Sequence, residues 1–96
     1  MTGNDAIDGY QYNEPRTIIY VMGIADGLFS ANGKLQVSKE RQIYCGPPSL
    51  DTGQVFGILS GFIARFPIAG QLHVGNALVE AFAEAFPCAY DRPSTQ

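Results

Sequence analysis

The chain is poor in the residues that catalytic and metal centres use, with one histidine and two cysteines among 96 residues. Cys45 and Cys88 form no CxxC pair, and no second cysteine or histidine pair accompanies them, so a zinc site is not predicted. His73 stands at a loop-to-helix junction, and no motif supplies it with a nucleophile or an orienting carboxylate. A structural or surface role is therefore the favoured interpretation of His73, and a cysteine nucleophile paired with it is a minor alternative. We expect that the protein is not an enzyme and that it has no cofactor and no metal site.

The carboxylates and glycines also lack a catalytic arrangement. Asp26 falls on or beside the apolar face of a predicted helix, where a buried, hydrogen-bonded carboxylate or a helix-packing residue is a simpler interpretation than a catalytic group. Glu80 and Glu84 lie four residues apart, as on a solvated helix face, and paired-carboxylate catalysis would require a cleft around them. Although the chain has 11 glycines, no stretch of it matches a phosphate-binding loop that follows a strand.

Positive charge and long apolar runs are scarce as well. Only six residues are lysine or arginine, they are scattered along the chain, and the net charge is −3. This composition argues against a nucleic-acid partner and favours a basic or neutral protein partner. No apolar run approaches the roughly 18 residues that a membrane-spanning helix needs.

The two cysteines are the most informative residues present. Each stands at the edge of a helix-like segment, so one Cys45–Cys88 bond would fasten both ends of a helical hairpin. In the chain-entropy model such a bond stabilises the fold by about 4 kcal/mol. Residues 1–8 lack the basic and apolar regions of a signal peptide. Either the protein is cytoplasmic with free thiols, or a leader was trimmed and Met1 is a cloning start; the cysteine placement favours the second, periplasmic alternative.

The helical signals predict an all-α bundle of three main helices in one domain, residues 14–90. Residues 1–13 indicate a flexible N-terminal arm, with room for one short turn or helix, and residues 91–96 a polar tail. The first main helix opens at Glu14-Pro15 and runs to about Ser30. A capping box of Asp51 and Gln54 starts the second, which ends before Pro67. The third runs from Val74 to Ala85, just before Pro87-Cys88.

The segment between the first two main helices, residues 32–49, breaks the helical pattern. Asn32-Gly33 is a turn signal, and residues 36–44 alternate weakly, so that both a short strand and an irregular loop remain open. Within the first main helix, Gly23 and Gly27 have the spacing that lets another helix approach closely. Because glycine destabilises a helix, we expect a packing reason for this pair, within the chain or as the seam of a homodimer.

Several short motifs follow one another with a specific spacing along most of the chain. Tyr44-Cys45-x-Pro47 is followed by Thr52-Gly53-Gln54-Val55, Phe66-Pro67, Ala77-Leu78-Val79-Glu80-Ala81-Phe82 and Phe86-Pro87-Cys88. With the first-helix segment 20–28, this framework resembles the Rap1a/Tai family of immunity proteins over residues 18–88. The resemblance implies a helical, disulfide-stapled periplasmic protein that is often a homodimer. It further implies that the chain binds and blocks a peptidoglycan-cleaving amidase toxin delivered by type VI secretion.

We expect the partner to be bound by loops that the stapled helices hold in place. The candidate contacts are Ile68, Gln71, Leu72 and His73 in one loop, and Lys34, Gln36 and Tyr44 in the longer connection. Two other functions remain open: a small periplasmic helical chaperone or stress protein, and a dimeric structural module with its seam at Gly23 and Gly27.

Overall fold

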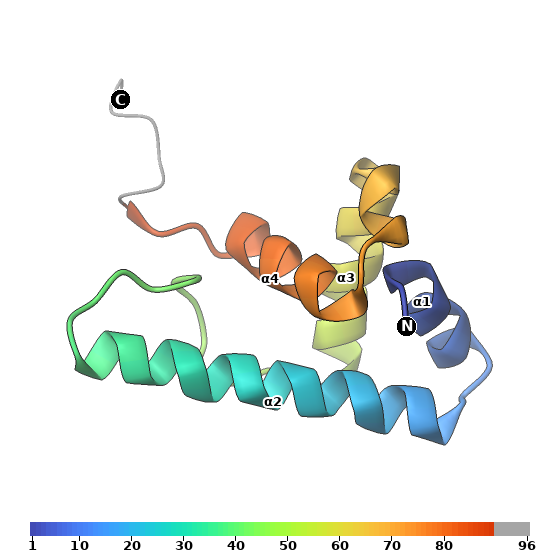
Figure 1. The fold of residues 1–96 in the computed structure, drawn as a ribbon, viewed down its shortest axis with the longest axis horizontal. Coiled ribbons are helices and arrows are strands. Elements are labelled where there is room, and N and C mark those ends of the chain that lie inside the picture. Colours follow the sequence, from blue (N-terminus) through green and yellow to red (C-terminus); the bar gives the residue numbers. More distant parts are fainter. Residues whose placement is uncertain (90–96) are drawn as a thin grey trace.

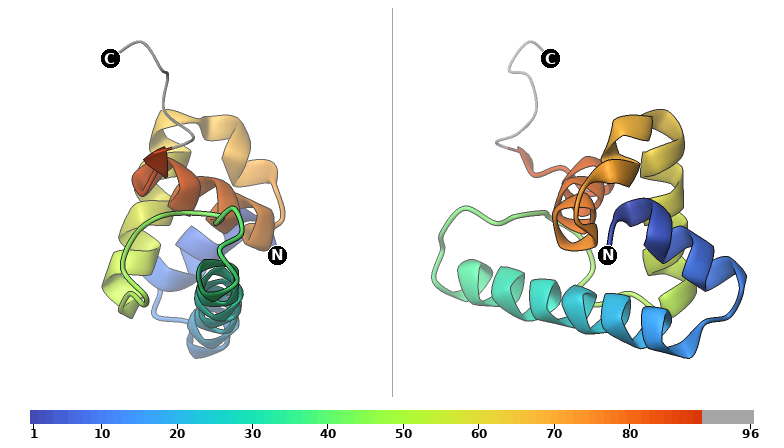
Figure 2. Two further views of the ribbon diagram at one scale, coloured as in Figure 1. Left: turned by 90° about the vertical axis from the view of Figure 1, so that its left-hand side faces the viewer. Right: turned by 45° about the vertical axis from the view of Figure 1, so that its right-hand side comes forward.

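The computed structural model describes residues 1–89; Tyr90 and the predicted polar tail, 91–96, lie outside them. The described residues form four α-helices and one short 3-10 helix: α1 (Gly3–Gln11), α2 (Pro15–Val37), α3 (Thr52–Arg65), η1 (Pro67–Gln71) and α4 (Val74–Ala85). Helix α2 runs along one side of the molecule, and the other helices gather against it (Figure 1). Two turned views show the same arrangement (Figure 2). The all-α prediction is confirmed for these residues, and none of their helices is long and apolar enough to cross a bilayer.

Helix α1 corrects the expected helix count from three to four. Its residues, interpreted from the sequence as a loose arm, begin with a capping box in which Thr2 Oγ1 accepts from Asp5 N and Asp5 Oδ2 accepts from Thr2 N. Ala6 is fully buried. Gly9 permits the close approach of α2, since a Cβ there would lie 2.4 Å from the Thr17 side chain. The glycines that indicate a loop in the sequence thus serve helix packing.

Helix α2 starts as predicted, with Glu14 as its N-cap before Pro15, but continues to Val37 rather than ending near Ser30. The turn predicted at Asn32-Gly33 is wrong. Asn32 is buried on the inner face of α2, in line with Val21, Ala25 and Phe29. The helix is capped instead by Ser38, which is followed by Lys39 with a positive φ of 58°.

The connection from Ser38 to Asp51 is irregular and contains no strand. The Asn32 side chain holds it in place. Asn32 Oδ1 accepts from Ile43 N at 2.7 Å and from Tyr44 N at 3.2 Å, and Asn32 Nδ2 donates to Tyr44 O at 2.9 Å. This one amide satisfies backbone groups that would otherwise be buried without partners.

Helices α3 and α4 begin and end where the sequence predicts. Asp51 and Gln54 form the capping box of α3, with hydrogen bonds of 2.8 and 2.9 Å. The two helices pack on each other and on α2. Phe82 of α4 lies at the centre of the core, where its ring contacts those of Phe29 and Tyr44.

The Cys45–Cys88 disulfide is confirmed, with the two Cα atoms 4.9 Å apart. It ties the connection to the segment that follows α4, and Cys45 N also donates to Phe86 O at 2.8 Å. Gly46 allows this contact, because a Cβ there would lie 2.6 Å from the Phe86 ring. The connection is therefore fixed to the helices at both Asn32 and the disulfide.

Candidate partner-binding surface

The loop formed by η1 and the two residues after it presents apolar side chains to solvent. Ile68 is 71% exposed and Leu72 is 39% exposed. Gln71 and His73 are exposed beside them, whereas Ala69 and Gly70 are buried and anchor the turn. The structure thus brings the four residues predicted in this loop together on the surface.

Backbone hydrogen bonds from the N-terminal segment hold the loop. Gly3 N donates to Leu72 O at 2.9 Å, and Val74 N donates to Met1 O at 3.0 Å. Thr2 and His73 face each other between them in an isolated antiparallel bridge. The segment expected to be an arm therefore supports the candidate loop.

His73 has two structural contacts. It is the N-cap of α4, where its Nδ1 accepts from Gly75 N at 3.1 Å. Its Nε2 lies 3.3 Å from the Tyr20 hydroxyl of α2. Because Nδ1 accepts, the neutral ring carries its proton on Nε2 and donates it to the Tyr20 oxygen. These bonds fix the imidazole relative to both helices.

Tyr20 is a surface residue that the sequence analysis missed. It is 44% exposed and joins the loop through His73, although 53 positions separate the two residues. Nothing local in the sequence indicates this contact, because it depends on how α2 packs beside the start of α4.

The second predicted contact region does not join the first. Lys34 and Gln36 are exposed in the last turns of α2, at the opposite end of the molecule from η1 (Figure 1). Tyr44 is only 1% exposed and belongs to the core, so its predicted role as a surface contact is wrong. Burial raises the pKa of its hydroxyl above the ordinary value.

Gly23 and Gly27 lie on the solvent side of α2. A Cβ added at either position would meet nothing within 4 Å. Among the described residues, the prediction that another helix of this chain packs closely against the pair is therefore wrong. A seam between two copies stays a prediction.

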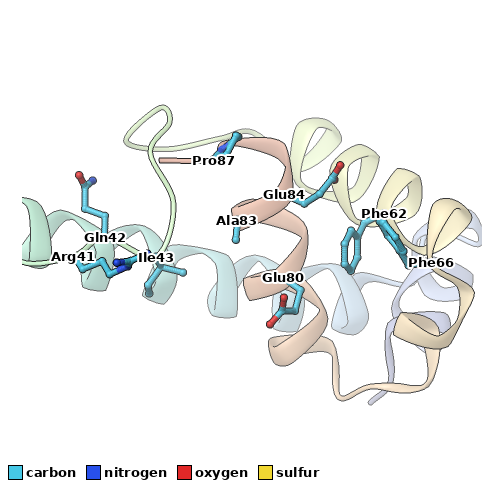
Figure 3. A pocket seen from close by; sticks show the side chains of 9 residues that line it. All are labelled: Arg41, Gln42, Ile43, Phe62, Phe66, Glu80, Ala83, Glu84 and Pro87. Atoms are coloured by element: carbon cyan, nitrogen blue, oxygen red, sulfur yellow. The ribbon is translucent and has the colours of Figure 1, made fainter. Parts of the chain in front are cut away.

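A shallow depression of about 680 Å³ crosses the outer face of α4. Figure 3 shows residues 41–43 on one side of this helix and the Phe62 and Phe66 rings on the other. Glu80, Ala83 and Glu84 of α4 lie between these two walls. This depression was not predicted from the sequence, although the four-residue spacing of Phe62 and Phe66 and of Glu80 and Glu84 could have indicated two facing helix stripes.

In the part of the chain that the structure describes, no three His, Cys, Asp or Glu side chains lie close enough together to hold a metal ion. Comparisons with protein-family models, curated proteins and solved structures gave no significant match. The arrangement at the loop is one of exposed apolar groups on a firmly held backbone, which is suited to protein recognition.

Proposed function

We propose that the protein is an immunity-type inhibitor that binds a peptidoglycan-degrading amidase toxin and blocks it. The observation that carries this proposal is the loop Ile68–His73, which exposes apolar side chains while its backbone is bonded to the N-terminal segment and to α4. The resemblance of residues 18–88 to immunity proteins supplies the class of partner.

Inhibition of this kind needs no reaction. Ile68 and Leu72 serve as apolar anchors that enter the cleft of the toxin, and Gln71 and His73 provide polar contacts at their edge. Because the loop is ordered before binding, little conformational entropy is lost on association. The net charge of −3 favours encounter with a basic protein.

The proposed compartment is the periplasm. A Cys45–Cys88 bond persists in oxidising compartments such as the periplasm and is rare in the cytosol. Peptidoglycan hydrolases act on the cell wall, so an inhibitor that meets them there has to be stable under oxidising conditions.

The test starts with capture of partners from the source cells on the oxidised protein, followed by an assay of the captured material for peptidoglycan amide hydrolysis. Ile68→Ser then removes an apolar anchor, and we expect it to weaken binding of the captured hydrolase by about tenfold or more. Tyr12→Ser is the matched control, because it removes an exposed apolar side chain at the far end of α1. Equal binding by the two variants, or capture without amidase activity, would contradict the proposal.

A further inference from the structure

The depression across α4 has an apolar wall that solvent reaches. Phe66, the C-cap residue of α3, is 48% exposed, and its ring centroid lies 5.1 Å from that of Phe62. Ala83 of α4 and Ile43 of the connection continue the apolar lining. An exposed phenylalanine beside such a lining offers a ring face on which another side chain can stack.

Negative charge faces the same depression. Glu84 is paired with Arg65 of α3. Glu80, one turn earlier on α4, is exposed, and its carboxylate makes no ion pair or hydrogen bond with another described residue. Arg41 lines the opposite wall and already has an interaction partner. Glu80 is thus the charged group of the depression that is left to be paired by a ligand.

Bonds within the chain hold part of each wall before any ligand arrives. Asn32 and the disulfide hold residues 43–45 against the helices. The Arg65–Glu84 pair joins α3 to α4 on the other side. A ligand that enters this depression therefore has less of it to order, which lowers the entropic cost of binding.

We propose that this depression receives a basic side chain, flanked by apolar ones, from the protein partner. An arginine satisfies both features of the site, because its guanidinium stacks on a phenylalanine face and pairs with a carboxylate. Phe66 directly precedes η1, so a partner that covers Ile68 lies next to the depression. This inference rests on the proposed function, since it assigns the basic segment to the same toxin.

The probe is a capped Ala-Leu-Arg-Leu-Ala peptide, titrated into the oxidised full chain and followed by amide chemical shifts. We expect saturable changes at residues 43, 66, 80 and 83. The same peptide with citrulline, which has the shape of arginine without its charge, should bind about threefold to fivefold more weakly, as expected for one partly exposed ion pair.

Two pairs of variants assign the binding to its residues. Glu80→Gln should weaken the arginine peptide by about threefold to fivefold, whereas Asp26→Asn, which removes an exposed carboxylate from α2, should leave it unchanged. Phe66→Ala should weaken binding of the peptide, and Tyr12→Ala should not, because Tyr12 is an exposed aromatic residue outside the depression. Circular dichroism of each variant checks that it keeps its helices.

Three results would overturn the inference. The first is an equal effect of Glu80→Gln and Asp26→Asn, and the second is equal binding of the arginine and citrulline peptides. The third is a set of concentration-dependent shifts at the same residues without peptide, which would mean that a second copy fills the depression. None of these tests uses the toxin. If the peptide does not bind as expected, the proposed inhibition through Ile68 is still tested by the binding of the Ile68→Ser variant to the captured hydrolase.

Discussion

At the scale of single residues, Asn32 organises the connection between α2 and α3. It is the only buried polar or charged residue of the described chain, and its amide bonds the backbone at positions 43 and 44 in three places. In the sequence the same residue precedes a glycine and indicates a turn. Its real role is tertiary, because it satisfies a loop that passes over the helix.

We predict that Asn32→Ala lowers the free energy of unfolding by about 3 kcal/mol, since it leaves buried backbone groups without partners. Asn76→Ala, at an exposed position of α4, is the control and should change stability by less than about 0.5 kcal/mol. Denaturant unfolding of both variants measures the difference. Similar midpoints would show that the Asn32 bonds do not hold the connection.

Asp5 gives the stability of α1 a pH dependence. Its hydrogen bonds to the backbone and side chain of Thr2 lower the pKa of its carboxyl below the ordinary 3.8. A carboxyl whose pKa is lower in the folded state stabilises that state above its unfolded pKa, and this stabilisation is lost as the pH falls through the folded pKa.

Asp5→Asn should therefore lower Tm at neutral pH, and the difference from the parent chain should shrink well below pH 3.8. Thermal unfolding at both pH values checks this, with Asp8→Asn as a matched charge removal on the same helix. A Tm difference that is constant with pH would mean that the ionised carboxylate does not stabilise the cap.

At the scale of elements, the exposed glycines of α2 distinguish a free helix face from a dimer seam. Neither Gly23 nor Gly27 has a positive φ or a close neighbour. For a monomer, Gly27→Ala should stabilise the fold by about 1 kcal/mol through helix propensity. Thermal unfolding measures this change.

Gly27→Leu is the companion variant, because it blocks close approach of a second copy without a clash inside the chain. If the glycines form a homodimer seam, this variant sediments as a monomer while the parent chain sediments as a dimer. Identical sedimentation of the two proteins would exclude the seam.

Local signals in the sequence predicted those elements whose ends they define. The Asp51–Gln54 box and Pro67 bound α3, and the Cys45–Cys88 bond follows from the placement of the two cysteines. A short helix was allowed for within residues 1–13 but was not placed, because the glycines and Asn4 of this segment outweighed the capping box of Thr2 and Asp5.

The candidate surface could likewise be predicted only where local sequence determines it. The loop 68–73 could be placed from its position between two helices. The contact of Tyr20 with His73 could not, since it depends on the packing of elements 53 residues apart, and neither could the burial of Tyr44.

At the scale of the whole molecule, the disulfide joins the connection to the end of α4 across 43 positions of sequence. Cys88 is fully buried, so its end of the disulfide belongs to the packed interior rather than to the surface. Replacing both cysteines by serine should lower the free energy of unfolding by about 4 kcal/mol. That is a large share of the roughly 5–15 kcal/mol typical of small domains.

Denaturant unfolding with and without reductant measures this contribution. The parent chain should lose stability on reduction, whereas the double serine variant should not respond. Equal midpoints for the oxidised and reduced parent chain would contradict the stabilising role of the bond.

The proposed activity of the whole protein is inhibition of a cell-wall amidase by binding it. The most direct measurement is a titration of the captured amidase, acting on purified peptidoglycan, with the oxidised chain. Amidase activity should fall in proportion to the added protein and should be abolished at equimolar amounts. Full amidase activity in the presence of an excess of the folded and oxidised chain would contradict the proposed inhibition.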